Sequence, residues 1–293
     1  MLEPQHMVMS GLSDEAGPTI TQQIEAHQAL GWQEMELRSV EGQALADWEE
    51  PLFQQVRSQL DSAGMRVTAV ASRIANWERP ITAPFKQDME ELKRVADRML
   101  ELGARYVRIM SYPNDGLPEL EWRDRAVERL HHLTELAHAA GIVLLHENCS
   151  GWGGVSPDHT LYLLRELNTP AFRLLFDTGN GIAYKYDALA FLQQVWPYVE
   201  HVHIKDGRLL DGEAVYTLPG EGHASVRACV QWLIEHDYRG IWAIEPHLHL
   251  IPHLHKSGDG QAMGQAYVTY GRCLEQLLED VRCSLKEGGA QVG

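Results

Sequence analysis

The stretch Glu121–Glu147, EWRDRAVERLHHLTELAHAAGIVLLHE, contains the structural unit that decides the fold. Its first part, up to Ala140, is a helical segment. Gly141 then marks the helix end, because helices commonly stop at a glycine in the left-handed conformation. The short apolar run that follows is typical of a buried strand, and it ends in the polar pair His146 and Glu147. The stretch therefore predicts a helix, a glycine stop and a strand with polar side chains at its carboxyl end.

The same unit recurs along the chain. In residues 85–102 the apolar side chains Met89, Leu92, Val95 and Met99 follow the helical period. Glycine separates a helix from the next strand at Gly31, Gly64, Gly103 and Gly141. Predicted helices cover residues 18–30, 50–63, 85–102, 121–140, 156–167, 187–196, 225–236 and 265–283. Predicted strands cover residues 6–12, 33–38, 66–72, 105–110, 142–147, 173–178, 200–205 and 241–246.

Eight strands that alternate with helices predict one parallel sheet, and eight is also the number that closes a barrel. We therefore predict an α/β protein with a single-domain (β/α)8 TIM barrel over residues 1–283. The tail over residues 284–293 is predicted to be disordered. A doubly wound open sheet is the alternative. It is disfavoured because no GxGxxG motif follows the first predicted strand.

Composition and charge limit the classes of function. The chain has 293 residues and a formal net charge of −16, which argues against a nucleic-acid partner because Lys and Arg hold such partners. No run approaches the ~20 apolar residues of a membrane span, and the first residues lack the features of a signal peptide. The four cysteines have no CxxC spacing, which favours reduced thiols in a cytoplasmic protein. The sequence leaves open whether the protein forms a homo-oligomer.

The seventh predicted strand lies in VEHVHIKDGR, residues 199–208. His201, His203 and Lys205 alternate with Val202 and Ile204, so this strand has one polar and one apolar face. In a barrel the apolar face would pack against the helices, and the polar face would point into the lumen. We therefore expect His203 to face a reaction site.

Four consecutive predicted strands end in side chains that can bind a metal ion. On the first of these strands, Val143 and Leu145 lie on the same face as Glu147. This face would point into the lumen, with Glu147 above an apolar layer. Each side chain alone is more often a helix cap, a surface group or a hydrogen-bonded core histidine. Converging carboxylates would repel each other, however, and a divalent cation removes that repulsion. The predicted metal ligands are Glu147, Asp177, His203 and Glu245.

These four residues, with the motifs FDTGN, HVHIKD, PGEG and AIEP around them, resemble the xylose-isomerase-like barrel superfamily, and most closely its sugar isomerase and epimerase branch. The resemblance covers essentially the whole chain, and its motifs are specific for the superfamily but weak for the substrate. It implies one divalent metal ion held by this set. Three carboxylates and one imidazole favour Mn²⁺, with Mg²⁺, Co²⁺ and Zn²⁺ as alternatives.

The resemblance also implies a chemistry. A small sugar substrate, a ketose or related polyol or keto-sugar, would lose a proton next to its carbonyl and form an enediolate that the metal stabilises. Glu147 and Glu245 would each be both ligand and acid–base group, on opposite sides of the sugar. Asp177 and His203 would be ligands only. Return of the proton to the opposite face gives epimerisation, and return to the neighbouring carbon gives isomerisation. The sequence determines neither the sugar nor its phosphorylation.

Further side chains near the strand ends are candidates for substrate contacts. Arg208 resembles an arginine with which family epimerases hold a substrate oxygen, whereas Asn180 stands where several members have a substrate-binding histidine. Lys205 would steady an enolate or neutralise an acidic rim. Each candidate also has a structural alternative, such as a solvated loop residue or an internal ion pair. The full set is Glu36, Arg38, Trp152, Asn180, Lys205, Arg208 and His247.

His146 supports a second interpretation. It directly precedes Glu147, and a titratable imidazole at this place could be the base. The arrangement resembles barrel subunits that eliminate a group from 3-oxo-sugars, so the alternative function is a metal-dependent lyase or dehydratase acting on a keto-sugar or inosose. The loop EPHLHLIPHLHKSGDG also leaves open a second metal site, formed by His247, His249, His253 and His255.

Two other classes fit the sequence less well. A DNA repair nuclease on this fold needs extra histidine ligands, but the third and fourth predicted strands end in AVASR and RIMSY. A non-catalytic sugar-binding protein would not need the metal ligands. A DNA-nicking assay tests the first class, and exchange of substrate hydrogen with D₂O tests the second.

Overall fold

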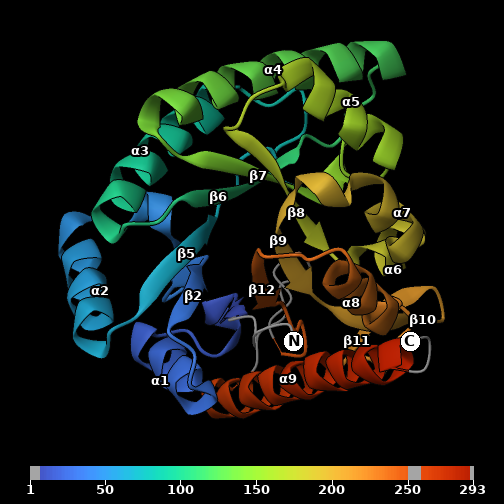
Figure 1. Cartoon of the computed structure of the whole chain (residues 1–293). Helices are drawn as coiled ribbons and strands as arrows, with labels where there is room; N and C mark the ends of the chain where they lie inside the picture. The colour runs from blue at the N-terminus through green and yellow to red at the C-terminus, as the bar shows by residue number, and fades with distance from the viewer. Residues whose placement is uncertain (1–6, 250–258, 291–293) are drawn as a thin grey trace.

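Eight parallel strands form the centre of the computed structural model, which describes residues 7–249 and 259–290. The strands pair in the order β1-β12-β9-β8-β7-β6-β5-β2, and a bridge between Leu12 and Glu36 joins the two ends of this row. The sheet is therefore nearly closed into a barrel (Figure 1). Its strands are β1 (Val8–Gly11), β2 (Glu34–Leu37), β5 (Arg66–Ala71), β6 (Tyr106–Ser111), β7 (Val143–Gly151), β8 (Phe172–Asp177), β9 (Val199–Ile204) and β12 (Ile241–Ile244).

Helices follow the strands and surround the barrel (Figure 1). The predicted glycine stops are confirmed, because Gly31, Gly64, Gly103 and Gly141 all adopt the left-handed conformation at a helix end. This alternation confirms the single-domain (β/α)8 TIM barrel over the open sheet. The helices are α1 (Ile20–Leu30), α2 (Glu50–Ala63), α3 (Lys86–Leu102), α4 (Glu119–Ala140), α5 (Pro157–Leu167), α6 (Asn180–Tyr184), α7 (Ala188–Val195), α8 (Val226–Glu235) and α9 (Gly260–Ala290).

Two antiparallel hairpins, which the sequence analysis did not predict, follow the carboxyl ends of β2 and β9. Asp211 and Gly212, in the turn of the second hairpin, both have positive φ, the geometry that an Asp-Gly turn typically adopts. The hairpins therefore add residues to the mouth of the barrel. Their strands are β3 (Ser39–Val40) with β4 (Gln43–Ala44), and β10 (Asp206–Leu210) with β11 (Glu213–Thr217); short 3-10 turns are η1 (Ser13–Glu15), η2 (Leu45–Asp47) and η3 (Trp196–Tyr198).

Two apolar regions stabilise the barrel. The main core lies between strands and helices and contains Val202 and Ile204, which confirms that the apolar face of β9 is turned to the helices. A small second cluster of Val143, Leu145 and Leu175 lies on the inward faces of β7 and β8. The lumen is therefore apolar at this level, and the inward residues that follow along the same strands point toward the mouth.

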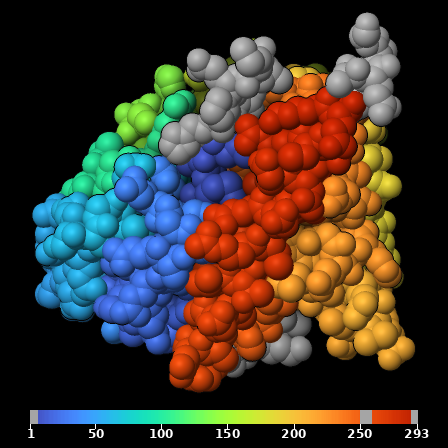
Figure 2. Space-filling model, turned by 60° about the horizontal axis from the view of Figure 1, so that its bottom comes forward, coloured from blue at the N-terminus to red at the C-terminus, as the bar shows by residue number. Residues whose placement is uncertain are grey.

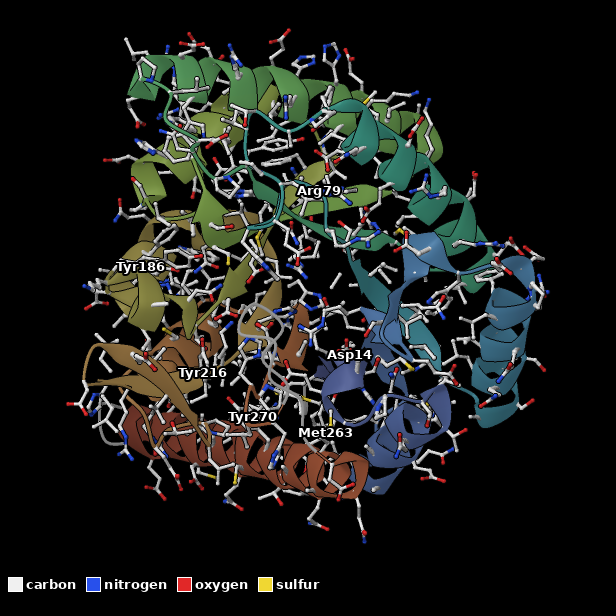
Figure 3. The ribbon with its side chains drawn as sticks, turned by 180° about the vertical axis from the view of Figure 1, so that it is seen from behind. Asp14, Arg79, Tyr186, Tyr216, Met263 and Tyr270 are labelled. Carbon is white, nitrogen blue, oxygen red and sulfur yellow. The ribbon has the colours of Figure 1, made fainter. Side chains whose placement is uncertain are left out.

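The last helix, α9, completes the ring of helices. It packs against α1, α8 and β12, and Figure 2 shows it (red) as a ridge between the blue N-terminal segment and the orange segment that precedes it. Met263 and Tyr270 are buried on its inner side (Figure 3). The Tyr270 hydroxyl donates a hydrogen bond to the carbonyl of Ile204 at 3.3 Å, so the helix is tied to β9.

The chain remains helical through residues 284–290, where we expected a disordered tail. Leu285 packs against the main core. The hydroxyl of Ser284 donates to the carbonyl of Asp280 at 2.8 Å, within the helix. The prediction of disorder rested on the position of this segment at the end of the chain, and it stays a prediction for residues 291–293, which lie outside the described residues.

The helices and the cysteines of the described part can be compared with the predictions on membrane spans and thiols. None of its helices combines the length and the apolar character that crossing a bilayer requires. All four cysteines are free thiols: Cys149 and Cys229 are buried, and Cys283 is exposed. The prediction of unpaired cysteines is confirmed.

We predict that His27 makes the stability of the protein depend on pH. Its fully buried ring joins α1 to α9: Nδ1–H donates to the carbonyl of Gln23 at 2.8 Å, and Nε2 accepts from the Tyr267 hydroxyl at 3.1 Å. Burial lowers the pKa of His27 from 6.5 to about 4. Below pH 6.5 the unfolded chain therefore binds a proton that the folded protein excludes, and the free energy of unfolding falls until the pH reaches about 4.

The loss due to His27 should be about 3 kcal/mol over this range, since each pKa unit corresponds to about 1.4 kcal/mol. Chemical denaturation of the wild type and of His27→Gln at several pH values between 4 and 7 measures it. The variant should lose less stability on acidification than the wild type. Parallel pH dependences of the two proteins would show that His27 is not the titrating group.

Candidate active site

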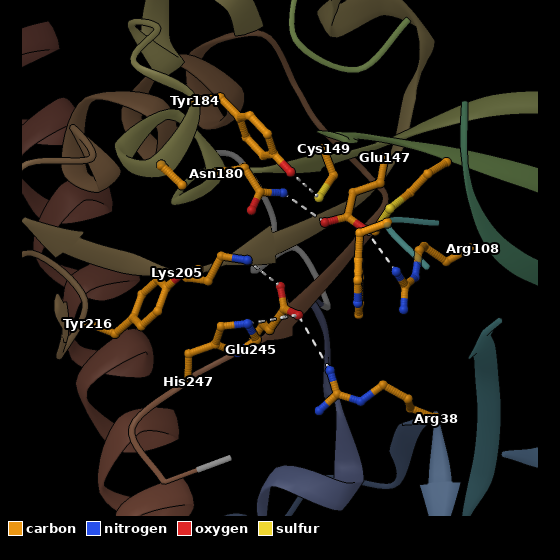
Figure 4. A pocket seen from close by; sticks show the side chains of 13 residues that line it. Arg38, Arg108, Glu147, Cys149, Asn180, Tyr184, Lys205, Tyr216, Glu245 and His247 are labelled. Atoms are coloured by element: carbon orange, nitrogen blue, oxygen red, sulfur yellow. Dashed lines mark hydrogen bonds and ion pairs between the residues drawn. The ribbon is translucent and has the colours of Figure 1, made fainter. Parts of the chain in front are cut away.

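The carboxyl ends of the barrel strands enclose a cavity of about 350 Å³ (Figure 4). This volume lies within the roughly 300–1,000 Å³ typical of small-molecule sites. Active sites of TIM barrels lie at this end of the barrel. The cavity is lined by Arg38, Trp77, Arg108, Met110, Glu147, Cys149, Asn180, Ala183, Tyr184, Lys205, Tyr216, Glu245 and His247.

The four side chains predicted as metal ligands converge at this cavity. Glu147 lies on β7, Asp177 ends β8, His203 lies on β9 and Glu245 directly follows β12. One ligand atom from each lies within 4.8 Å of the others, and all four residues are buried. Three carboxylates and one imidazole in this arrangement can hold a metal ion.

Lys205 supplies positive charge to this cluster. Its buried Nζ lies 2.7 Å from Asp177 Oδ2 and 2.8 Å from Glu245 Oε2. Burial alone would lower the pKa of Lys205, but the two carboxylates hold that pKa well above its usual value. Burial raises the pKa of Asp177 well above the ordinary carboxyl range. Despite burial, Lys205, His247 and His203 hold the pKa of Glu245 well below its usual value, so Glu245 is ionised.

Asp177 is held by the chain around it. Its Oδ1 accepts hydrogen bonds from the backbone N–H groups of Gly179 at 2.6 Å and Asn180 at 2.9 Å. Asn148 fixes the main chain of Asp177 on both sides, because its amide donates to the carbonyl at 2.8 Å and accepts from the N–H at 2.6 Å. The second carboxylate oxygen, Oδ2, is therefore left to face Lys205 and the cluster.

Glu36 lies beneath the cluster and does not line the cavity, contrary to its predicted contact with substrate. Its Oε2 lies 2.8 Å from His203 Nε2 and 3.1 Å from His201 Nε2. The two imidazoles hold the pKa of Glu36 below its usual value despite burial, so the carboxylate accepts and both Nε2 atoms donate. His203 is thereby oriented with Nδ1 at 3.3 Å from Glu245 Oε2.

Asn180 and Arg108 orient the carboxylate of Glu147. The Asn180 amide donates to Oε1 at 2.8 Å, and an Arg108 guanidinium nitrogen lies 3.3 Å from Oε2. Asn180 thus lines the cavity as predicted, next to a proposed ligand. Arg108 was not singled out from the sequence, although it lies two residues after Tyr106 on the inward face of β6, where counting along the strand would have found it.

Arg38 and His247, both predicted to contact substrate, line the cavity, and both contact Glu15. The Arg38 guanidinium lies 3.0 Å from Asp14, 3.5 Å from Glu15 and 3.6 Å from Glu245. His247 has the left-handed backbone conformation, with φ of 52°, and its N–H and Nδ1 contact the Glu15 carboxylate at 2.6 Å and 2.9 Å. Glu15, Glu245 and His247 form a further group in which a metal ion could be held.

Arg208 and Trp152 do not line the cavity. Arg208 is exposed on the β10–β11 hairpin. Trp152 is buried, stacks on His159 with 4.2 Å between ring centroids, and donates its Nε1–H to Glu119 at 2.6 Å. Neither position supports the substrate contact that we predicted.

His146 lies on the opposite face of β7 from Glu147 and is also absent from the cavity wall. It stacks against Phe172, with 5.7 Å between ring centroids. Burial lowers the pKa of His146 to about 3, and neither ring nitrogen has a hydrogen-bond partner among the described residues. A role as catalytic base is therefore not supported by its position.

Six further lining residues were not singled out from the sequence: Trp77, Met110, Cys149, Ala183, Tyr184 and Tyr216. Tyr216 belongs to the unpredicted β10–β11 hairpin, and Tyr184 ends α6. Cys149 lies on β7, and burial raises the pKa of its thiol to about 12, so it remains protonated. Of the histidine-rich loop, His249 is exposed, whereas His253 and His255 lie outside the described residues. A second metal site in this loop stays a prediction.

Known proteins with a similar sequence or fold include sugar epimerases and dehydratases. The 2-epi-5-epi-valiolone 7-phosphate 2-epimerase of Actinoplanes sp. is 30% identical over 198 residues, which cover 63% of this chain and 70% of that protein. Inosose dehydratase 1 of Bacillus cereus is 25% identical over 194 residues, covering 56% of this chain and 64% of that protein. A D-tagatose 3-epimerase-like protein superposes with a TM-score of 0.72 over 95% of this chain and 100% of that structure; the identity of 18% shows a common fold.

A family match covers most of the barrel. It extends over residues 24–266 and includes every strand from β2 to β12. The segment thus contains the whole set of Glu147, Asp177, His203 and Glu245. The chain belongs to the xylose isomerase-like TIM barrel family.

Proposed function

We propose that the protein is a divalent-metal-dependent sugar isomerase or epimerase that acts through an enediolate on a ketose or a related keto-sugar or polyol. The observation that carries the proposal is the convergence of Glu147, Asp177, His203 and Glu245 into one group, two members of which, Glu147 and Glu245, line a sugar-sized cavity. The similarity to an epimerase of a cyclic polyol phosphate supports the same reaction class.

The donor set fits a hard divalent cation such as Mn²⁺ or Mg²⁺, because carboxylate oxygens outnumber nitrogens and no thiolate belongs to the group. The raised pKa of Asp177 indicates that its buried carboxylate lacks sufficient positive charge nearby. A bound divalent ion would supply that charge and stabilise the negative charge that develops on the substrate oxygens. Glu147, Asp177, His203 and Glu245 would hold it.

The chain's own residues perform the proton transfers in this proposal. Glu147 and Glu245 come from strands on different sides of the mouth, so one carboxylate removes a proton next to the substrate carbonyl and the other returns one. Asn180 and Arg108 hold Glu147, while Arg38 and Lys205 hold Glu245. These contacts orient both carboxylates before the substrate binds, which reduces the entropy cost of reaching the reactive geometry.

A dehydratase acting on an inosose or a keto-sugar is the second candidate, and the similarity to an inosose dehydratase favours it. Both reactions begin with the removal of a proton next to a carbonyl. The buried, outward position of His146 does not support the particular form in which this residue is the base. In a dehydratase one of the two glutamates would remove the proton next to the carbonyl, and the other would protonate the hydroxyl group on the neighbouring carbon, which then leaves as water.

Glu147→Gln and Glu245→Gln should each lower turnover by about 10²–10⁴-fold, because the amide cannot accept the proton. The assay measures the incorporation of solvent deuterium into a panel of ketoses, inososes and 3-keto-sugars in D₂O with Mn²⁺. Product analysis separates an epimer or isomer from a dehydrated product. Turnover at the wild-type level with metal still bound would show that the two glutamates are not the bases.

Glu36→Gln should weaken metal binding by about 10–100-fold, because Glu36 fixes the orientation and tautomer of His203. Titration of the purified protein with Mn²⁺, followed by electron paramagnetic resonance, measures the affinity without turnover. Glu34→Gln is the matched control, since Glu34 lies on the same strand and pairs with Arg66 at the surface. An unchanged affinity in Glu36→Gln would refute the orienting role.

His146→Leu should keep its turnover within about twofold of the wild type and raise the free energy of unfolding by about 1–3 kcal/mol. The reason is that the imidazole is buried without hydrogen bonds against apolar neighbours, so leucine removes a desolvation cost. Steady-state kinetics and chemical denaturation measure both effects. A large loss of activity in a folded, metal-loaded variant would restore His146 as a candidate base.

A further inference from the structure

A second cavity adjoins the candidate active site. It has a volume of about 260 Å³ and shares Arg38, Trp77 and Arg108 with the first cavity. In Figure 4, Arg38 and Arg108 lie on the side of the site away from Tyr184 and Tyr216, so the second cavity extends the site in that direction. It is lined by Asp14, Arg38, Ser39, Gly42, Ala44, Asp47, Ala71, Ser72, Arg73, Asn76, Trp77, Glu78 and Arg108.

Ion pairs hold the loop that carries Trp77 and forms one wall of this second cavity. Arg79 pairs with Asp88 and Glu91 of α3. Arg73 pairs with the same Glu91 at 3.3 Å and with Asp47 at 2.7 Å. Because both acidic partners on α3 are buried, these contacts anchor the loop to the scaffold.

Backbone hydrogen bonds tie the same loop to the end of β6. The N–H of Met110 donates to the carbonyl of Ile74 at 3.2 Å, and the N–H of Tyr112 donates to the carbonyl of Ala75 at 2.9 Å. Ala75 is held in the left-handed conformation, with φ of 57°, and is fully buried. Side chains and main chain together therefore preform the wall of the second cavity, which favours binding of a defined ligand.

The charge in the second cavity is balanced. Three arginines, Arg38, Arg73 and Arg108, face three carboxylates, Asp14, Asp47 and Glu78, among the lining residues. A phosphate group would meet these carboxylates at unfavourable distances, since like charges repel strongly where water is partly excluded. Hydroxyl groups suit the lining better, because each can donate to a carboxylate and accept from a guanidinium.

Trp77 adds the remaining feature. It lines both cavities and is half-buried. An aromatic surface among hydrogen-bonding groups fits a ring that has apolar C–H faces and a polar edge. Within the described residues, this cavity therefore combines a preformed wall, balanced charge and one aromatic surface.

We propose that this second cavity binds a second, uncharged sugar ring, so that the natural substrate is a glycoside of the reacting keto-sugar. The inference rests on the proposed function, because it places the reacting ring next to Glu147 and Glu245. The second ring would lie beyond Arg38, Trp77 and Arg108. The proposed substrate is therefore larger than a single ketose, and it carries no phosphate group.

The test compares matched sugars with and without the second ring. D-fructose is compared with its glycosides lactulose, turanose and isomaltulose, and 3-ketoglucose with 3-ketosucrose; D-fructose 6-phosphate is the charged comparison. Affinities come from titration calorimetry on the Mn²⁺-loaded protein, and deuterium exchange in D₂O supplies kcat/KM. At least one glycoside should bind about tenfold or more tightly than its parent sugar. Preference for the phosphate ester, or equal affinity for parents and glycosides, would overturn the inference.

Substitutions at two positions, Ala44 and Trp77, test whether the preference for glycosides comes from the second cavity. Ala44→Trp fills the second cavity from the β3–β4 hairpin and does not touch the first, so it should abolish the preference for glycosides and leave the parent sugars unchanged. Trp77→Ala should lower the same ratio, and Trp77→Phe should restore most of it; thermal unfolding verifies that each variant is folded. An unchanged ratio in folded Ala44→Trp would overturn the second-ring site. Absence of exchange with every sugar would instead reject the proposed reaction, while the calorimetric comparison would still decide whether a second ring binds.

Discussion

Mutual repulsion among buried carboxylates is the constraint on which the site depends. Glu147, Asp177 and Glu245 are buried with ligand atoms that lie within 4.8 Å of one another, and burial disfavours the ionised form of a carboxyl group. Lys205 and Arg38 offset part of this cost for Glu245. The compensation is incomplete, since the pKa of Asp177 stays well above its usual value. A divalent cation would complete it, which connects the stability of the barrel mouth to the proposed chemistry.

The fold makes this convergence possible because each ligand comes from a different strand. In a parallel barrel all carboxyl ends meet at one mouth, so residues far apart in the chain become neighbours. Val143, Leu145 and Leu175 form an apolar layer inside the lumen, and the polar groups of the site lie above this layer. Glu36 adds a support beneath the mouth, where it orients His203. The reactive groups are therefore held by rigid strands, while the loops after the strands form the outer walls.

These outer walls enclose two adjoining cavities at the mouth, and the two cavities differ in the residues that line them. The part next to Glu147 and Glu245 is rich in ionised groups and suits proton transfer. The part beyond Trp77 has balanced charge and a wall tied to α3 and β6, which suits recognition of an uncharged polar ring.

The sequence by itself determined the barrel and the four converging side chains. Helical periods, glycine stops and period-two alternation are local properties, and parallel topology then brings strand ends together. It did not determine which polar residues reach the cavity. Tertiary structure decided that Glu36 lies beneath the cluster against His203, that Arg208 is exposed on a hairpin, and that Tyr216 of the same hairpin lines the cavity. The reason is physical: strand pattern fixes the face on which a side chain lies, but loop paths and burial costs depend on contacts between distant segments.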